Sequence, residues 1–344
     1  MNGKTKTIFF VFGLAILFYM LYQFGFDNIV INIKRTGWWF LPITGIYLFV
    51  YLMNTIAWKL IMKAGYNRIS FKDLFTISIS GFAINYITPF VNLGGEPYKI
   101  LALKDQLGIH RSVSSVILYS MLHILSSFVF WIGAILLVLF TLAMTSEFKI
   151  ILEIVLFASL LGTLFLFTRH KKGIFRSIIK IIPKLPFSSQ LNDRIKLKEE
   201  SLEIIDEQIT DLFNNKKNIF YSTLFLEVGA RVVASLEFIF ILRSVGIYIS
   251  MVEAIYINAF LSLVINILFF MPMTLGVREG SLYFIMEILK FTSGVGVYIA
   301  LVTRIRELFW ISVGLLLIQL RKHKPAADKN IDNLSVEWES VNKQ

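Results

Sequence analysis

The chain has 344 residues, of which 56% are hydrophobic and only 17% charged, and its mean hydropathy is +0.70. Such a composition excludes an ordinary soluble globular protein and predicts an integral membrane protein. Lys and Arg exceed Asp and Glu by 11, but the basic residues cluster beside apolar segments, so membrane lipid rather than nucleic acid is the expected partner. The absence of cysteine excludes disulfides, thiolate nucleophiles and cysteine-based metal centres.

Long apolar runs recur along nearly the whole chain, which favours several membrane-spanning helices over a single anchor. A window of about 19 residues predicts six spans, at residues 8–24, 38–62, 112–145, 149–168, 218–242 and 294–320. Two further apolar stretches, at 73–89 and 253–271, each run into a break that contains proline and glycine and then into a shorter helical piece. We therefore predict an all-α integral membrane protein with about six transmembrane helices and two inverted, re-entrant broken-helix hairpins.

The distribution of Lys and Arg predicts the orientation, because basic residues are retained on the cytoplasmic side. Lys4 and Lys6 place the N-terminus inside, ahead of an uncleaved first helix, and six spans return the C-terminus to the inside of the cell membrane. The strongest inside signal is the loop at 169–217, with eleven Lys and Arg residues and an amphipathic pattern. A connecting helix at the membrane surface explains this pattern, with a partner-binding helix as the alternative. We predict one membrane domain over 1–321 and a polar cytoplasmic tail over 322–344.

The two breaks are similar to each other. The first break, residues 89–96 (PFVNLGGE), and the second break, residues 272–279 (PMTLGVRE), each run from a proline to a glutamate. The predicted orientation has the first entering the membrane from the inside and the second from the outside. Inverted repeats with broken helices are typical of transporters, and the predicted repeat halves are residues 38–145 and 218–320.

Irregular backbone inside a bilayer is tolerated only where it is buried in protein or lines a wet cavity. Gly94, Gly95 and Gly276 permit backbone angles that other residues resist, and the helices that follow them begin with bare N–H groups. These helix N-termini are therefore a candidate site for an anion such as phosphate. Glu96 and Glu279 either cap these helices or contact a cationic headgroup, and both alternatives stay open.

Further polar residues near the breaks are candidate headgroup contacts. Arg278 suits a phosphate as a bidentate clamp, with a salt bridge to Glu279 as the alternative. Asn85 and Lys99 flank the first break and can reach a headgroup, although Lys99 can equally extend towards the membrane surface. His123 stands alone in an apolar run, which is typical of a hydrogen bond between helices rather than of a metal site.

Two pairs of opposite charges lie inside the predicted spans. Glu227 and Arg231 are four residues apart on one helix face, and Arg304 and Glu307 also share a face. In one interpretation both pairs are structural salt bridges. In the other, Arg231 or Arg304 binds a lipid phosphate. The sequence has no nucleotide-binding or hydrolase motif, so no cofactor is expected and transport would use a gradient or the membrane potential.

The stretches at 85–103 (NYITPFVNLGGEPYKILAL), 270–289 (FMPMTLGVREGSLYFIMEIL) and 304–310 resemble the flippase-like family typified by the membrane region of lysylphosphatidylglycerol synthase. The resemblance spans roughly residues 5–320. It implies a domain that moves aminoacylated phosphatidylglycerol, or a related anionic or polyprenyl-linked lipid, across the bacterial cytoplasmic membrane. The resemblance covers the membrane region alone, and we expect no aminoacyltransferase domain after residue 320, unlike in the full synthase.

Two alternatives come from other functional classes. One is a lysyl-tRNA-dependent phosphatidylglycerol lysyltransferase involved in resistance to cationic antimicrobial peptides, for which the basic loop gives only weak support. The other is a carrier for a soluble small molecule. The expected partner is a membrane phospholipid. A separate lipid-modifying enzyme and a homo-oligomer are left open.

Overall fold

The computed structural model describes residues 25–63, 69–88, 94–141, 145–170, 215–269 and 276–321, together with residues 210–211, 271 and 274 and six positions before residue 25. Its described secondary structure is helical throughout, which confirms the all-α class. The first half contains α2 (Phe26–Thr36), the short 3-10 helix η1 (Gly37–Trp39), α3 (Phe40–Lys63), α4 (Phe71–Ile87), α5 (Gly95–Leu107), α6 (Ile109–Thr141) and α7 (Ser146–His170). The second half contains α11 (Lys217–Arg243), α12 (Met251–Ile267), α13 (Val277–Ile288) and α14 (Ser293–Leu320).

Within the part of the chain that the structure describes, three helical stretches are long and apolar enough to cross a membrane, namely Val30–Met62, Ile109–Thr141 and Ser146–Leu166. Helices α11 and α14 have 27 and 28 residues, which corresponds to about 40 Å at the α-helical rise and exceeds the hydrocarbon thickness. Both carry several charged residues within this length. The predicted first span lies almost entirely outside the described residues, as do the amphipathic loop helix and the polar tail.

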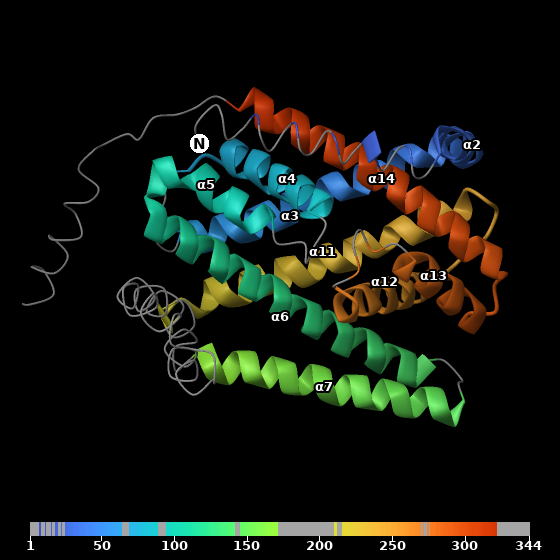
Figure 1. Cartoon of the computed structure of the whole chain (residues 1–344). Helices are drawn as coiled ribbons and strands as arrows, with labels where there is room; N and C mark the ends of the chain where they lie inside the picture. The colour runs from blue at the N-terminus through green and yellow to red at the C-terminus, as the bar shows by residue number, and fades with distance from the viewer. Residues whose placement is uncertain are drawn as a thin grey trace, which may run out of the picture.

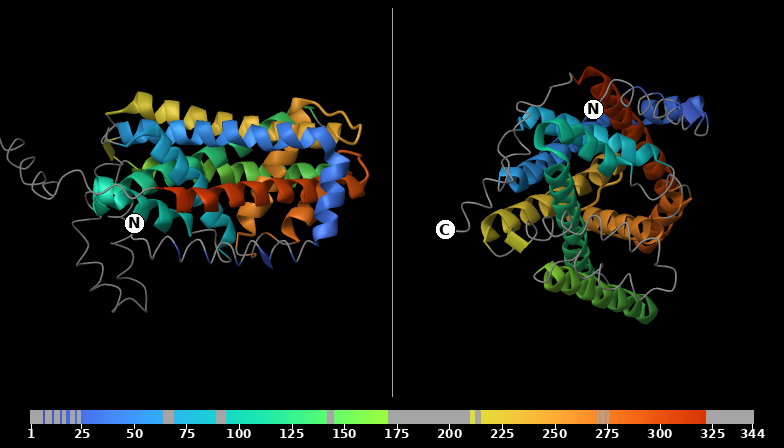
Figure 2. Two further views of the ribbon diagram at one scale, coloured as in Figure 1. Left: turned by 90° about the horizontal axis from the view of Figure 1, so that it is seen from above. Right: turned by 60° about the vertical axis from the view of Figure 1, so that its left-hand side comes forward.

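One helix was not predicted. Helix α2 carries Lys34 and Arg35 in its last turn, where the negative end of the helix dipole favours positive charge. The Arg35 guanidinium also lies 4.8 Å from the ring centroid of Tyr298 on α14. In the left view of Figure 2, α2 lies across the end of the bundle at an angle to α3. These basic residues therefore belong to a helix rather than to a connecting loop.

The two halves pack in the same order (Figure 1). Helices α3 and α11 lie side by side, and each is followed by two short helices and one long helix. Helix α4 packs against α14 of the other half, and α12 packs against α6 in the corresponding way. Helix α7 lies at the edge of the bundle, where it packs mainly against α6 and keeps much of its apolar surface exposed. The helix order therefore matches an internal repeat.

The short helices on either side of the breaks are α4 and α12 with 17 residues each, α5 with 13 and α13 with 12. Each extends at most about 26 Å, which is less than the hydrocarbon core of roughly 30 Å. These lengths suit arms that turn back inside the membrane. Their re-entry from opposite sides stays a prediction.

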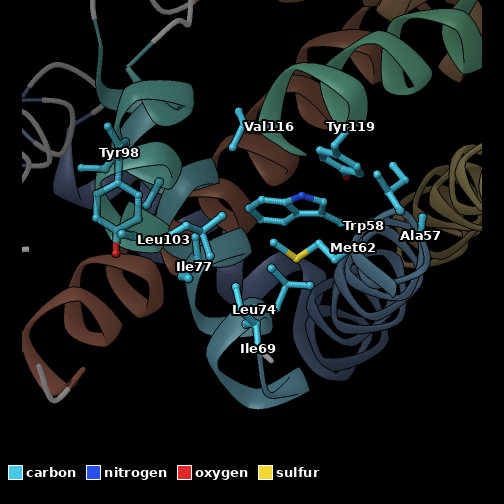
Figure 3. Close-up of a cluster of buried hydrophobic side chains, with 14 of the residues drawn as sticks. Ala57, Trp58, Met62, Ile69, Leu74, Ile77, Tyr98, Leu103, Val116 and Tyr119 are labelled. Carbon is cyan, nitrogen blue, oxygen red and sulfur yellow. The ribbon is translucent and has the colours of Figure 1, made fainter. Parts of the chain in front are cut away.

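Aromatic residues anchor the core of the first half (Figure 3). Trp58 on α3 is fully buried, stacks on Tyr119 of α6 with 5.3 Å between ring centroids, and donates a 3.0 Å hydrogen bond to Ser115. Ile77 on α4 and Leu103 on α5 belong to the same buried cluster. This core fixes both arms of the first broken unit against α3 and α6, so the position of the first break is set by packing.

Candidate functional site

Asn85 closes the first break from the last turn of α4. Its Oδ1 accepts a 2.6 Å hydrogen bond from the backbone N–H of Gly95, and its Nδ2 donates to Glu96 at 3.3 Å. A Cβ at Gly95 would lie 2.3 Å from the carbonyl oxygen of Gly81, so only glycine allows α5 to start this close to α4. Gly94 is the N-cap residue of α5 and packs against Thr88. The N-terminus of α5 is thus partly occupied by a side chain of the chain itself.

Lys99 points into the protein and not towards the membrane surface. Lys99 is 8% exposed, and its ammonium nitrogen lies 5.6 Å from the ring centroid of Trp58 and 5.4 Å from that of Tyr119. The carboxylate of Glu96 lies 3.8 Å away, and its second oxygen, Oε2, is buried without a hydrogen-bond partner among the described residues. The first break therefore holds a charged pair whose carboxylate retains one free acceptor.

Glu279 caps its own helix at the second break, as one of the two interpretations predicted. The N-cap residue Gly276 has a φ of 76° and donates its N–H to the Glu279 carboxylate at 3.0 Å. The same carboxylate lies 2.7 Å from Arg304 of α14. Capping and pairing are therefore combined in one side chain.

The salt bridge between Arg278 and Glu279, one of the two alternatives for Arg278, does not form, because neighbouring residues on a helix point in different directions. Arg278 instead lies 2.7 Å from Glu307, and both side chains are buried. Similarly, Arg304 and Glu307 do not pair along α14 as predicted from their spacing, because each meets an oppositely charged residue of α13 first. Both ion pairs therefore connect α13 to α14.

Arg306 is a buried residue that the sequence interpretation missed. It makes two hydrogen bonds with Glu237 of α11, at 2.8 and 3.1 Å, and its guanidinium lies 3.5 Å from the ring centroid of Tyr47. The Tyr47 hydroxyl donates to the same carboxylate at 2.9 Å. The available signal was the density of charge in α14, where three of four successive residues are ionisable in an otherwise apolar helix.

Contacts between opposite charges link Arg278, Glu307, Arg306 and Glu237 into one chain, and Arg304 and Glu279 form a further pair between α13 and α14. We call these six residues the charge network. It contains as many guanidinium groups as carboxylates. Tyr86, in the last turn of α4, donates a hydrogen bond to Glu307 and so links the first broken unit to the network. A phosphate at Arg278 or Arg304 would therefore have to replace a carboxylate that already occupies that position.

A second polar cluster joins α6 to α11. His123 Nδ1 lies 2.6 Å from Glu227 Oε2, which confirms the prediction of a hydrogen bond between helices. Arg231 was expected to pair with Glu227, but it donates to Ser126 at 3.0 Å and to the backbone oxygen of His123 at 2.9 Å. Glu227 is 1% exposed and its Oε1 has no hydrogen-bond partner among the described residues. An isolated acceptor of this kind is costly to bury unless a ligand or water completes it.

This cluster lines a cavity of about 170 Å³, which we call the polar cavity, between α3, α6, α11 and α12. Its lining residues are Tyr47, Val50, Asn54, His123, Phe130, Glu227, Ala230, Arg231, Ala234, Asn258 and Ser262. Among the residues predicted as substrate contacts, Arg231 lines the polar cavity, and the others lie at the breaks or in the charge network. Tyr47 connects the polar cavity to the charge network, because it lines the cavity and also donates a hydrogen bond to Glu237.

Comparison with known families agrees with this architecture. A model described as the lysylphosphatidylglycerol synthase TM region matches residues 7–314, which include both breaks, the charge network and the polar cavity. Comparisons with curated proteins and with solved structures found no match. The resemblance inferred from the sequence is confirmed over most of the chain. The chain is an all-α membrane protein that belongs to the lysylphosphatidylglycerol synthase TM region family.

Proposed function

We propose that the chain is a lipid flippase of the bacterial cytoplasmic membrane. It moves the polar headgroup of aminoacylated phosphatidylglycerol, or of a related anionic or polyprenyl-linked lipid, through the polar interior of the bundle while the acyl chains stay in the bilayer. The observation that carries this proposal is the polar cavity, which brings Glu227 and Arg231 together inside a bundle of membrane-capable helices. Ionisable residues at such depth are expensive and mark substrate pathways.

The charges in the polar cavity suit an aminoacylated phospholipid. The Arg231 Nη1 nitrogen has no hydrogen-bond partner among the described residues and can donate to a phosphate oxygen. The free Glu227 Oε1 can accept a hydrogen bond from an ammonium group, and the buried Oδ1 of Asn54 is a second unpartnered acceptor. One site thus offers a donor for the phosphate and acceptors for the amino group.

The proposal includes the energy source and the partners. No nucleotide-binding motif occurs in the sequence, so the lipid moves down its own gradient or with the membrane potential, which supplies about 2.3 kcal/mol per charge per 100 mV. A separate lipid-modifying enzyme supplies the aminoacylated lipid. The N- and C-termini both face the cytoplasm in this proposal.

The test uses the purified full chain in vesicles that contain fluorescent lysyl-phosphatidylglycerol. Movement of the lipid between leaflets is measured by the fraction that a membrane-impermeant quencher reaches over time. We expect the wild type to accelerate this movement and Glu227→Gln to slow it at least tenfold. Glu153→Gln is the matched control, because Glu153 is exposed on α7 and remote from the polar cavity.

Three outcomes would contradict the proposal. Wild-type protein that leaves the lipid in one leaflet excludes a flippase for this lipid. Uptake of a soluble solute into the vesicles without any lipid movement favours a small-molecule carrier. Formation of new lysyl-lipid from lysyl-tRNA and phosphatidylglycerol by this chain alone favours the lysyltransferase.

A further inference from the structure

A second cavity lies directly beside the polar cavity and has the opposite character. It measures about 50 Å³ and is lined almost wholly by apolar side chains of α6, α7, α12 and α13; we call it the apolar cavity. Its lining residues are Trp131, Ala134, Ile135, Val138, Phe148, Leu152, Tyr256, Ala259, Phe260, Leu263, Ile285, Ile288 and Leu289. The enclosing helices α6 and α7 are two of those long and apolar enough to cross a membrane.

The two cavities share one wall, where α6 packs against α12. On α6, Phe130 lines the polar cavity and the next residue, Trp131, lines the apolar cavity. On α12, Ser262 lines the polar cavity and Leu263 the apolar cavity. The indole N–H of Trp131 donates a 2.8 Å hydrogen bond to Ser262. A single side-chain contact therefore bridges the wall between the polar and the apolar space.

The corresponding wall in the other half, between α4 and α14, is closed. Ser80 donates a 3.1 Å hydrogen bond to the backbone oxygen of Gly314. A Cβ at Gly314 would lie 2.8 Å from the carbonyl oxygen of Ile79, so the two backbones are already in contact. The α6–α12 pair instead contributes lining residues to both cavities, so the two equivalent helix pairs differ in how closely they pack.

We propose that the α6–α12 wall is the binding site of a membrane phospholipid, whose headgroup occupies the polar cavity while a short segment of one acyl chain enters the apolar cavity and the rest of the chain stays in the bilayer. This inference rests on the proposed function and specifies where the lipid binds. An amphipathic molecule matches two adjacent cavities of opposite character, which neither a soluble solute nor a free phosphate does. The surrounding bilayer supplies the ligand, because the outer faces of α6 and α7 expose large apolar residues.

The Trp131–Ser262 hydrogen bond joins α6 to α12 in the wall that separates the headgroup from the acyl chain. The Trp131 ring contributes apolar surface to one cavity, while its N–H reaches the hydroxyl that lines the other. Trp131→Phe keeps most of the ring and removes the donor. Because the ring still fills its place, this variant separates the effect of the hydrogen bond from that of packing.

The experiment uses the full chain in vesicles containing phosphatidylglycerol with a photoactivatable diazirine in one acyl chain. After irradiation, mass spectrometry locates the labelled residues. We expect labelling of Ala134, Val138 and Leu263 at least threefold above that of Phe157 and Leu161, which are exposed on the outer face of α7. Binding at equilibrium is measured here, so the result does not depend on transport.

Filling the apolar cavity supplies the matched comparison. Ala259→Leu, inside the cavity, should reduce labelling there at least fivefold, whereas Ala158→Leu on the exposed surface of α7 should leave it unchanged. If Ala259→Leu does not fold, Leu152→Trp fills the same cavity from α7. Trp131→Phe should change the ratio of labelling between Leu263 and Val138 by at least twofold.

The outcomes separate this inference from the proposed function. Labelling no higher in the apolar cavity than on α7, or unaltered by filling the cavity, overturns the site even if the lipid is transported. Labelling of the cavity by a lipid that never changes leaflets supports the site and rejects the flippase.

Discussion

The guanidinium of Arg278 lies 2.7 Å from the carboxylate of Glu307, and this contact fixes the start of α13 against the middle of α14. Tyr86, at the end of α4, donates a hydrogen bond to the same carboxylate. One buried carboxylate therefore connects the helices that adjoin the two breaks, although the breaks are far apart in the sequence. The two broken units are held together by polar contacts as well as by apolar packing.

Glu307→Gln should strongly destabilise the protein. Removing one partner of a buried ion pair leaves an uncompensated charge, here Arg278, and costs about 3–5 kcal/mol. The free energy of unfolding, measured by denaturant titration in mixed micelles, tests this value. Glu287→Gln is the control, because Glu287 is exposed on α13 and its change should remain within about 0.5 kcal/mol.

A double-mutant cycle of Arg278→Met and Glu307→Gln tests the pairing directly. Because the double variant removes both charges, it should be more stable than the sum of the two single losses by at least about 1 kcal/mol. Strictly additive losses would show that the two side chains do not interact.

Gly314→Ala should destabilise the contact between α4 and α14. The added methyl group would lie 2.8 Å from the Ile79 carbonyl oxygen and 2.5 Å from the Cβ of Ala83, so the helices must separate. Overpacking of this kind costs about 1–3 kcal/mol. In Gly133→Ala on α6 the methyl group meets open space, and the gain in helix propensity should raise stability by up to about 1 kcal/mol. Thermal unfolding of both variants in detergent tests whether Gly314→Ala lowers the melting temperature and Gly133→Ala raises it.

Asn85→Ala should loosen the first break. The N–H of Gly95 and the carboxylate of Glu96 both lose a partner, which costs about 1–3 kcal/mol where these groups are buried. The measurement is hydrogen–deuterium exchange of the peptide that contains Gly95, which should become faster. Asn266→Ala is the matched control, because Asn266 is exposed and bonds only within its own helix, to Ser262. Equal acceleration in both variants would contradict a closing role for Asn85.

Arg306→Lys keeps the charge but should still weaken the protein by roughly 2 kcal/mol, because lysine cannot make the bidentate contact with Glu237 or stack on Tyr47. Unfolding in mixed micelles measures this difference. Arg243→Lys is the control at the exposed end of α11. If Arg306→Lys were as stable as the wild type, a positive charge alone would be sufficient to pair with Glu237.

The positions of most helices could be predicted from the sequence. The predicted spans at 112–145, 149–168, 218–242 and 294–320 lie within four residues of α6, α7, α11 and α14, because a long apolar run defines a helix without reference to its neighbours. The two interrupted helices were also found, since proline and glycine mark the end of regular hydrogen bonding. Helix α2 was missed because its charges interrupt the apolar pattern on which the prediction depends.

The partners within the candidate site could be predicted only in part. Spacing along a helix identifies residues that share a face, and it therefore paired Glu227 with Arg231 and Arg304 with Glu307. The actual partners lie on other helices, as with His123 and Glu227, and depend on how those helices cross. The polar cavity and the Trp131–Ser262 contact arise from packing between distant segments, for which a single sequence contains no direct signal.

The equal number of guanidinium and carboxylate groups in the charge network has an electrical consequence. While all six groups are ionised, a displacement of α11, α13 and α14 as a unit carries no net charge of the network through the membrane field. The network then contributes no gating charge to such a movement, and a voltage of 100 mV, worth about 2.3 kcal/mol per elementary charge, acts on the charge of the headgroup instead. A cationic and a neutral headgroup should therefore respond differently to the same applied voltage.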